Sequence, residues 1–103
     1  MVRDRVDPLL AIEIFQRDQM CIAAAWSRSH RCSGRLTLDH FWHRPGGVKG
    51  KRAPSDKYHL VTMCDGENNR PPSHDLRMFE RRYIAHHYHL NLKALLRGDY
   101  EKP

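Results

Sequence analysis

The spacing of hydrophobic residues predicts an α+β domain that begins with a helix. Leu9, Ile12 and Phe15 recur at the spacing of one helical face. The Asp7-Pro8 pair is typical of a helix start, with an acceptor side chain at the N-cap and a proline at the first helical position. We therefore expect a first helix from about Pro8 to Asp18.

Two later segments predict short strands, because apolar and polar residues alternate along them. The first runs from Arg35 to His40, and its two leucines are expected to point into the core while Asp39 faces outward. The second runs from Tyr58 to Met63. Between them, about Trp42 to Asp56, three glycines and two prolines exclude a regular element.

The last third of the chain predicts helices that pack on these strands. Ser73 is expected to cap a helix whose apolar face carries Leu76, Phe79, Tyr83 and Ile84. Three arginines of this helix, at 77, 81 and 82, are assigned to its solvent face. A final helical piece is expected around Leu92 to Leu96. We interpret residues 1–103 as one domain, with a core at about 18–69 and C-terminal helices at about 73–97.

Charge favours a polyanionic partner, because 18 lysines and arginines against 12 acidic residues give a net charge of +6. Within the long loop, the basic residues could follow a phosphate backbone; they are Arg44, Lys49, Lys51, Arg52 and Lys57. The alternative is a solvated basic loop with no partner.

The chain has no apolar run as long as a membrane span, and no apolar signal-peptide core follows its first residues. We therefore expect no membrane association and a cytoplasmic location. Three cysteines are an odd number, which argues against a disulfide framework and favours free thiols or metal ligands.

Several short motifs occur in a fixed order. Asp39-His40 ends the first predicted strand, Gly46-Gly47 lies in the loop, and His59-Leu60-Val61-Thr62-Met63-Cys64 covers the second strand. Asn68 follows four residues after Cys64. From about Asp18 to Asn69, this ordered set resembles the signature of HNH nucleases, in particular small phage-type members with a similar Cys-to-Ser-Gly-Arg-Leu-Thr lead-in.

The resemblance implies a ββα-metal finger, formed by two short antiparallel strands and a helix, with additional helices on either side. It also implies an endonuclease that hydrolyses DNA phosphodiester bonds, by nicking or by double-strand cleavage. Because only about 50 residues lie outside the motif, we expect low sequence specificity. His40 would then take the proton from the attacking water, and Asp39 and Asn68 would hold one metal ion. Their hard oxygen donors favour Mg²⁺ or Mn²⁺.

Two positions depart from the family pattern. His59 stands where the family has asparagine, a residue that holds the loop through side-chain hydrogen bonds. A histidine can do the same with one donor and one acceptor, so we include His59 with His40 among the candidate catalytic residues. The alternative is a strand histidine with no role. Asn68 replaces the commoner histidine ligand, which leaves the choice of metal open.

The cysteines raise the separate question of a structural zinc. Many HNH proteins hold zinc on two Cys-x-x-Cys pairs, whereas this chain offers only Cys21, Cys32 and Cys64. With His30 or Glu67 as a fourth donor they could form a tetrahedral site. Buried free cysteines are the alternative. Four further histidines, at 74, 86, 87 and 89, are expected on helix surfaces.

Two rival functions remain open from the sequence. The chain could be a non-catalytic nucleic-acid-binding module, whose DNA binding would not depend on magnesium. It could also be an accessory subunit of a phage DNA-packaging machine with a terminase-like partner. DNA is the expected partner in the nuclease interpretation.

Overall fold

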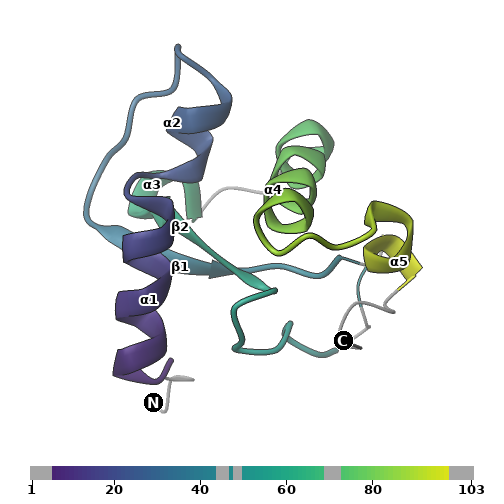
Figure 1. The fold of residues 1–103 in the computed structure, drawn as a ribbon. Helices are drawn as coiled ribbons and strands as arrows, with labels where there is room; N and C mark the ends of the chain where they lie inside the picture. The colour runs from purple at the N-terminus through teal and green to yellow at the C-terminus, as the bar shows by residue number, and fades with distance from the viewer. Residues whose placement is uncertain (1–5, 44–46, 48–49, 69–72, 98–103) are drawn as a thin grey trace.

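The computed structural model describes residues 6–43, 47, 50–68 and 73–97, which form a two-stranded antiparallel sheet surrounded by helices (Figure 1). The class is therefore α+β, as predicted. The elements follow in the order α1 (Pro8–Asp18), α2 (Ile22–Trp26), β1 (Leu36–His40), β2 (Leu60–Cys64), α3 (Asp65–Asn68), α4 (His74–His87) and α5 (Leu92–Arg97).

The register of the two strands separates the chemically interesting residues. Leu36 pairs with Cys64 at one end of the ribbon, and His40 pairs with Leu60 at the other. Every residue of β2 is buried, so this strand runs through the core. The Asp39-His40 pair and Cys64 therefore lie toward opposite ends of the same two-stranded ribbon.

The predicted orientation of β1 is wrong. Leu36 is 47% exposed, whereas Asp39 is only 9% exposed and Phe41, just after the strand, is 3% exposed. Residues two apart share a face of a strand, so burial of Phe41 also places Asp39 on the side that faces the core. The large aromatic side chain buries more apolar area than either leucine would, which is a physical reason for this choice of face.

The first helix has the predicted bounds, and an ion pair at its C-terminal end joins it to β2. Asp18 accepts hydrogen bonds from the backbone nitrogen of Thr62 at 2.7 Å and from the hydroxyl of Tyr83 at 2.6 Å. Arg17, paired with Asp18, donates to the carbonyl oxygen of Leu60 at 2.7 Å. Asp7 occupies the N-cap position, but its side chain makes no capping hydrogen bond.

Two short helices were not predicted as such. α2 lies in the segment after Cys21, and α3 replaces the turn expected after Cys64. Each is five residues or fewer, which is too short for a helical period to show in the sequence. The second strand also lies slightly later than predicted, from Leu60 to Cys64.

The predicted cap of α4 is confirmed, since Ser73 accepts a hydrogen bond from the backbone nitrogen of Leu76 at 3.0 Å. Its arginines are only partly where we expected them. Arg82 is exposed, but Arg81 is 6% exposed and Arg77 is half-buried. Arg81 donates to the carbonyl oxygen of Trp42 at 3.1 Å, so it fastens the helix to the chain after β1. The histidines at 74, 86 and 87 are exposed on α4, as predicted, whereas His89 is exposed but lies after the end of the helix.

Among the described residues, no helix combines the length and the apolar character that crossing a bilayer requires. A central apolar cluster instead joins the sheet to the helices. It includes Ile22 from α2, Val61 and Met63 from β2, and Ile84 from α4. This core holds the ends of the two strands in place for the sites described next.

Candidate functional site

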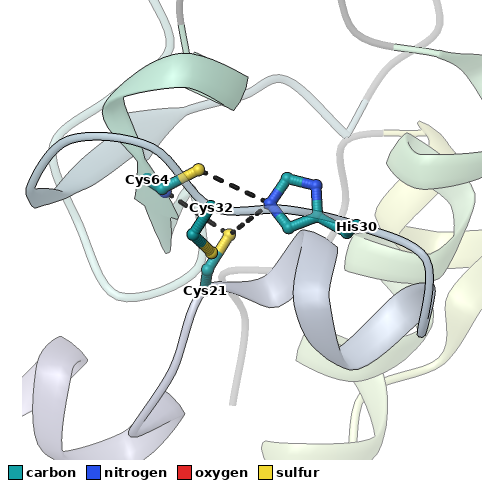
Figure 2. A group of neighbouring side chains, drawn as sticks. All are labelled: Cys21, His30, Cys32 and Cys64. Carbon is teal, nitrogen blue, oxygen red and sulfur yellow. Dashed lines mark hydrogen bonds between the residues drawn. The ribbon is translucent and has the colours of Figure 1, made fainter.

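Four potential metal ligands meet where α2, the loop after it and the end of β2 come together. They are Cys21, His30, Cys32 and Cys64, and their donor atoms all lie within 4.8 Å of one another. Figure 2 shows the ring nitrogen of His30 directed at the sulfurs of Cys21 and Cys64, with Cys32 beside them. Residues far apart in sequence thus form one cluster, hereafter the Cys/His cluster.

The geometry distinguishes between the two fourth donors that the sequence left open. His30 Nε2 lies 3.7 Å from Cys21 Sγ and 3.5 Å from Cys64 Sγ. The other ring nitrogen, Nδ1, lies 3.6 Å from Oε1 of Glu67. His30 therefore belongs to the cluster, and Glu67 lies behind it. Metal-binding histidines commonly have such a carboxylate on their second nitrogen.

The thiols of the cluster differ in acidity. Cys32 is exposed as a residue, but desolvation of its sulfur, together with the neighbouring thiols of Cys21 and Cys64, raises the pKa of Cys32 to about 12. Burial also opposes ionisation of Cys64, but hydrogen bonds from the backbone of Ser33 and Glu67 outweigh it and lower the pKa of Cys64 to about 7. Three thiolates this close would repel one another, and a bound cation would remove that conflict. The cluster can therefore bind a metal ion that prefers sulfur and nitrogen donors.

The second candidate site lies at the end of β1. Asp39 Oδ2 accepts a hydrogen bond from Arg77 Nη1 at 2.7 Å, and the Nε2 atom of His40 lies 2.8 Å from the hydroxyl oxygen of Ser55. Burial raises the pKa of Asp39, although the Arg77 guanidinium opposes the shift. Adjacent strand residues face opposite ways, so the carboxylate and the imidazole diverge at this end of the strand.

The short helix α3 brings Asn68 back against β1. Its amide nitrogen donates to Thr37 Oγ1 at 2.9 Å and approaches the carbonyl oxygen of Leu38 at 3.4 Å. Thr37 and Asp39 share a face of the strand, so the two predicted oxygen ligands, Asp39 and Asn68, belong to the same side of β1. The contact with Thr37 uses the amide nitrogen and leaves the carbonyl oxygen, the atom that a metal ion would bind.

His59 is fully buried, and its side chain contacts the turn that precedes β2. Its Nδ1 atom lies 2.8 Å from Asp56 Oδ1, which also accepts from the backbone nitrogens of Tyr58 and His59 at 2.9 and 3.1 Å. The His59 ring centroid is 4.8 Å from that of His43, which is also fully buried. These contacts close the turn before β2, and they place the His59 ring in the interior.

The predicted nucleic-acid-binding residues that the structure describes differ in their exposure to solvent. Lys51 and Arg52 are exposed, as a backbone-binding loop requires. Lys57 is half-buried, with its Nζ atom 4.9 Å from the ring centroid of Tyr88. Arg44 and Lys49 lie outside the described residues.

Sequence reasoning missed several residues around the end of β1. Ser55 and Asp56 contact the two histidines of the motif, and Glu80 lies behind Arg77 with its Oε1 atom 2.8 Å from Nη1. The Arg77–Glu80 spacing of three residues was a signal, because such pairs meet on a helix. No comparable pattern identifies Ser55.

Comparison of the chain with protein-family models, with curated proteins and with solved structures finds no match. The function is therefore inferred from the residues and their arrangement. Two features need an explanation: a sulfur-rich cluster at one end of the sheet, and an Asp-His pair with a docked asparagine toward the other.

Proposed function

We propose that this protein is a metal-dependent HNH endonuclease in which β1, β2 and α3 form the ββα-metal finger. The position of Asn68 carries the proposal. The side chain docks on β1 from α3, on the face that Asp39 shares, and β1 ends in His40. This supports a carboxylate and an amide oxygen acting as metal ligands on one face of β1, with the proposed base, His40, next in sequence on the other face at the end of the strand.

The contact between Ser55 and His40 suits that role for the imidazole. If Nε2 carries the ring proton and donates it to the hydroxyl oxygen of Ser55, the Nδ1 atom keeps its lone pair. His40 would then accept a proton from the water that attacks the phosphodiester. A divalent ion bound by Asp39 and Asn68 would supply charge stabilisation for the phosphate and the departing 3′ oxygen. Both ligands are hard oxygen donors, which favours Mg²⁺ or Mn²⁺.

The proposed substrate is DNA, bound chiefly through its backbone. The net charge of +6 and the exposed side chains of Lys51 and Arg52 support phosphate contacts, which do not depend on base sequence. We therefore expect low sequence specificity, with targeting provided by a partner such as a terminase-like packaging protein.

We also propose that the Cys/His cluster binds a structural Zn²⁺ ion. Three sulfurs and one imidazole nitrogen make a complete tetrahedral set, and four protein ligands leave no open position for catalysis. The ion would tie α2 and its following loop to the end of β2. A chain of 103 residues has a small core, so such a crosslink would contribute strongly to stability.

The deciding experiment is cleavage of supercoiled plasmid by the zinc-loaded protein with Mg²⁺, with Mn²⁺ and with neither. We expect nicking that requires the added ion, and a rate roughly 10²–10⁴-fold lower for His40→Ala. The matched control is His86→Ala, because His86 is an exposed histidine on α4. Unchanged cleavage by His40→Ala would contradict the assignment of the base. Salt-sensitive DNA binding without cleavage would instead favour a non-catalytic binding module.

A further inference from the structure

Arg77 lies against the carboxylate proposed to hold the catalytic metal. A single nitrogen, Nη1, contacts both Asp39 Oδ2 at 2.7 Å and Glu80 Oε1 at 2.8 Å. The guanidinium also lies 5.4 Å from the ring centroid of Phe41. Its position is therefore fixed by three residues, and only one of them belongs to the motif that resembles HNH nucleases.

The burial of Glu80 is the unusual part of this arrangement. Its side chain is 0% exposed, and among the described residues its second oxygen, Oε2, has no hydrogen-bond partner. A buried carboxylate is costly, and an apolar residue of similar size usually stabilises a fold at least as well. The buried position of Glu80 is therefore better explained by its ion pair with Arg77, which it holds in place, than by a contribution to the stability of the fold.

The two ends of this arrangement differ in access to solvent. Arg77 retains 18% exposure of its side chain and Asp39 retains 12%, while Glu80 is sealed in the interior. Among these three side chains, an anion arriving from solvent can therefore reach Arg77, which is in contact with Asp39, but it cannot reach Glu80. Arginine suits such an anion because its planar fork of N–H groups matches the oxygens of a phosphate.

We propose that Arg77 contacts the scissile phosphate and that Glu80 is the positioning residue that holds Arg77 for this contact. The inference rests on the proposed nuclease function, because it takes Asp39 as a metal ligand. When Asp39 binds the metal ion, Arg77 loses its contact with Asp39 but remains paired with Glu80. Its N–H groups then donate to a phosphate oxygen. The covalent step remains that of the His40 mechanism.

The test compares Arg77→Ala, Arg77→Lys and Glu80→Gln with Arg82→Ala. Arg82 is exposed on the same helix, five residues further on and so on a different face, which makes it a matched control. Three measurements are made on each zinc-loaded variant: the cleavage rate, the affinity for Mn²⁺ without DNA, and the salt dependence of DNA affinity in Ca²⁺.

We expect Arg77→Ala to lower kcat/KM by about 10²-fold and Glu80→Gln by about 10-fold. The slope of log affinity against log salt should fall by about one charge for Arg77→Ala. Its Mn²⁺ affinity should not weaken, because a competing cation has been removed from Asp39. Added guanidinium ion should restore part of the activity of Arg77→Ala, whereas Arg77→Lys should retain only part of the wild-type rate.

The inference is overturned if Arg77→Ala behaves like Arg82→Ala in rate and salt slope. It is also overturned if Arg77→Ala and Arg77→Lys lose Mn²⁺ affinity and thermal stability together, because that pattern indicates a structural ion pair. If the wild-type protein does not cleave with any metal, the nuclease proposal fails separately. The salt dependence then decides by itself whether Arg77 contacts a phosphate.

Discussion

The Oε1 atom of Glu67 lies 3.6 Å from Nδ1 of His30, on the side of the ring away from the cysteines. Glu67 is the neighbour of Asn68 on α3, and Cys64 immediately precedes this helix. One helical turn therefore begins beside a ligand of the Cys/His cluster and ends at the proposed ligand of the catalytic metal. The state of the first site should influence the geometry of the second.

Removing metal from the Cys/His cluster should destabilise the protein and weaken the second site. Because the ion would hold α2, the His30 loop and β2 together, we expect its loss to lower the Tm by roughly 10 °C or more. The affinity for Mn²⁺ at Asp39 and Asn68 should fall with it, since α3 loses its anchor. Both are measured with and without stoichiometric Zn²⁺. A Tm that does not respond to Zn²⁺ would refute the structural-zinc proposal.

A milder change at the same place is Glu67→Gln. The variant keeps the shape of the side chain but removes the charge that orients the imidazole of His30, so we expect zinc affinity to fall about 10-fold. Competition with a chromophoric chelator measures the affinity. Glu13→Gln, at an exposed position of α1, is the control and should bind zinc as the wild type does. Equal affinities for the two variants would show that Glu67 has no role in zinc binding.

Ser55→Ala should reduce the cleavage rate through His40. The hydroxyl is 2.8 Å from His40 Nε2, and without it the imidazole loses the contact that selects its tautomer. We expect kcat to fall about 10-fold, with KM and Mn²⁺ affinity little changed. Ser55→Thr retains the hydroxyl and should preserve most of the rate. A wild-type rate for Ser55→Ala would mean that the contact does not position the base.

The stability of the protein should decrease in mildly acidic solution because of His43. Burial, together with the nearby His59, lowers the pKa of His43 from 6.5 to about 4. Below pH 6.5 the unfolded chain binds a proton at this residue that the folded protein does not. Stability is therefore present above that pH and is lost as pH falls toward 4.

The expected contribution of His43 is about 2 kcal/mol less stability at pH 5 than at pH 7.5. Urea unfolding at the two pH values measures the total change, to which other groups also contribute. His43→Gln keeps a side-chain donor for the carbonyl oxygen of Tyr58 but cannot titrate, so the difference between the proteins isolates His43. The same pH dependence in both proteins would contradict the prediction.

Local patterns in the sequence correctly predicted much of the fold. The first helix has the predicted bounds, Ser73 caps α4 as expected, and both strands are present within two residues of their predicted limits. These features depend on interactions between residues close in sequence, such as capping and periodic burial. The choice of Asp39, His40 and Asn68 likewise came from ordered motifs, and their role in catalysis stays a prediction.

The type and order of the longer elements, the positive charge and the set of residues able to do chemistry could all be predicted from the amino-acid sequence. Three features became apparent only from the folded structure. Phe41 and Asp39 form the buried face of β1, His30 joins the cysteines with Glu67 behind it, and Arg77 lies between Asp39 and Glu80. The reason is physical. Each of these outcomes depends on contacts between segments distant along the chain, and on which side chains bury the most apolar area together.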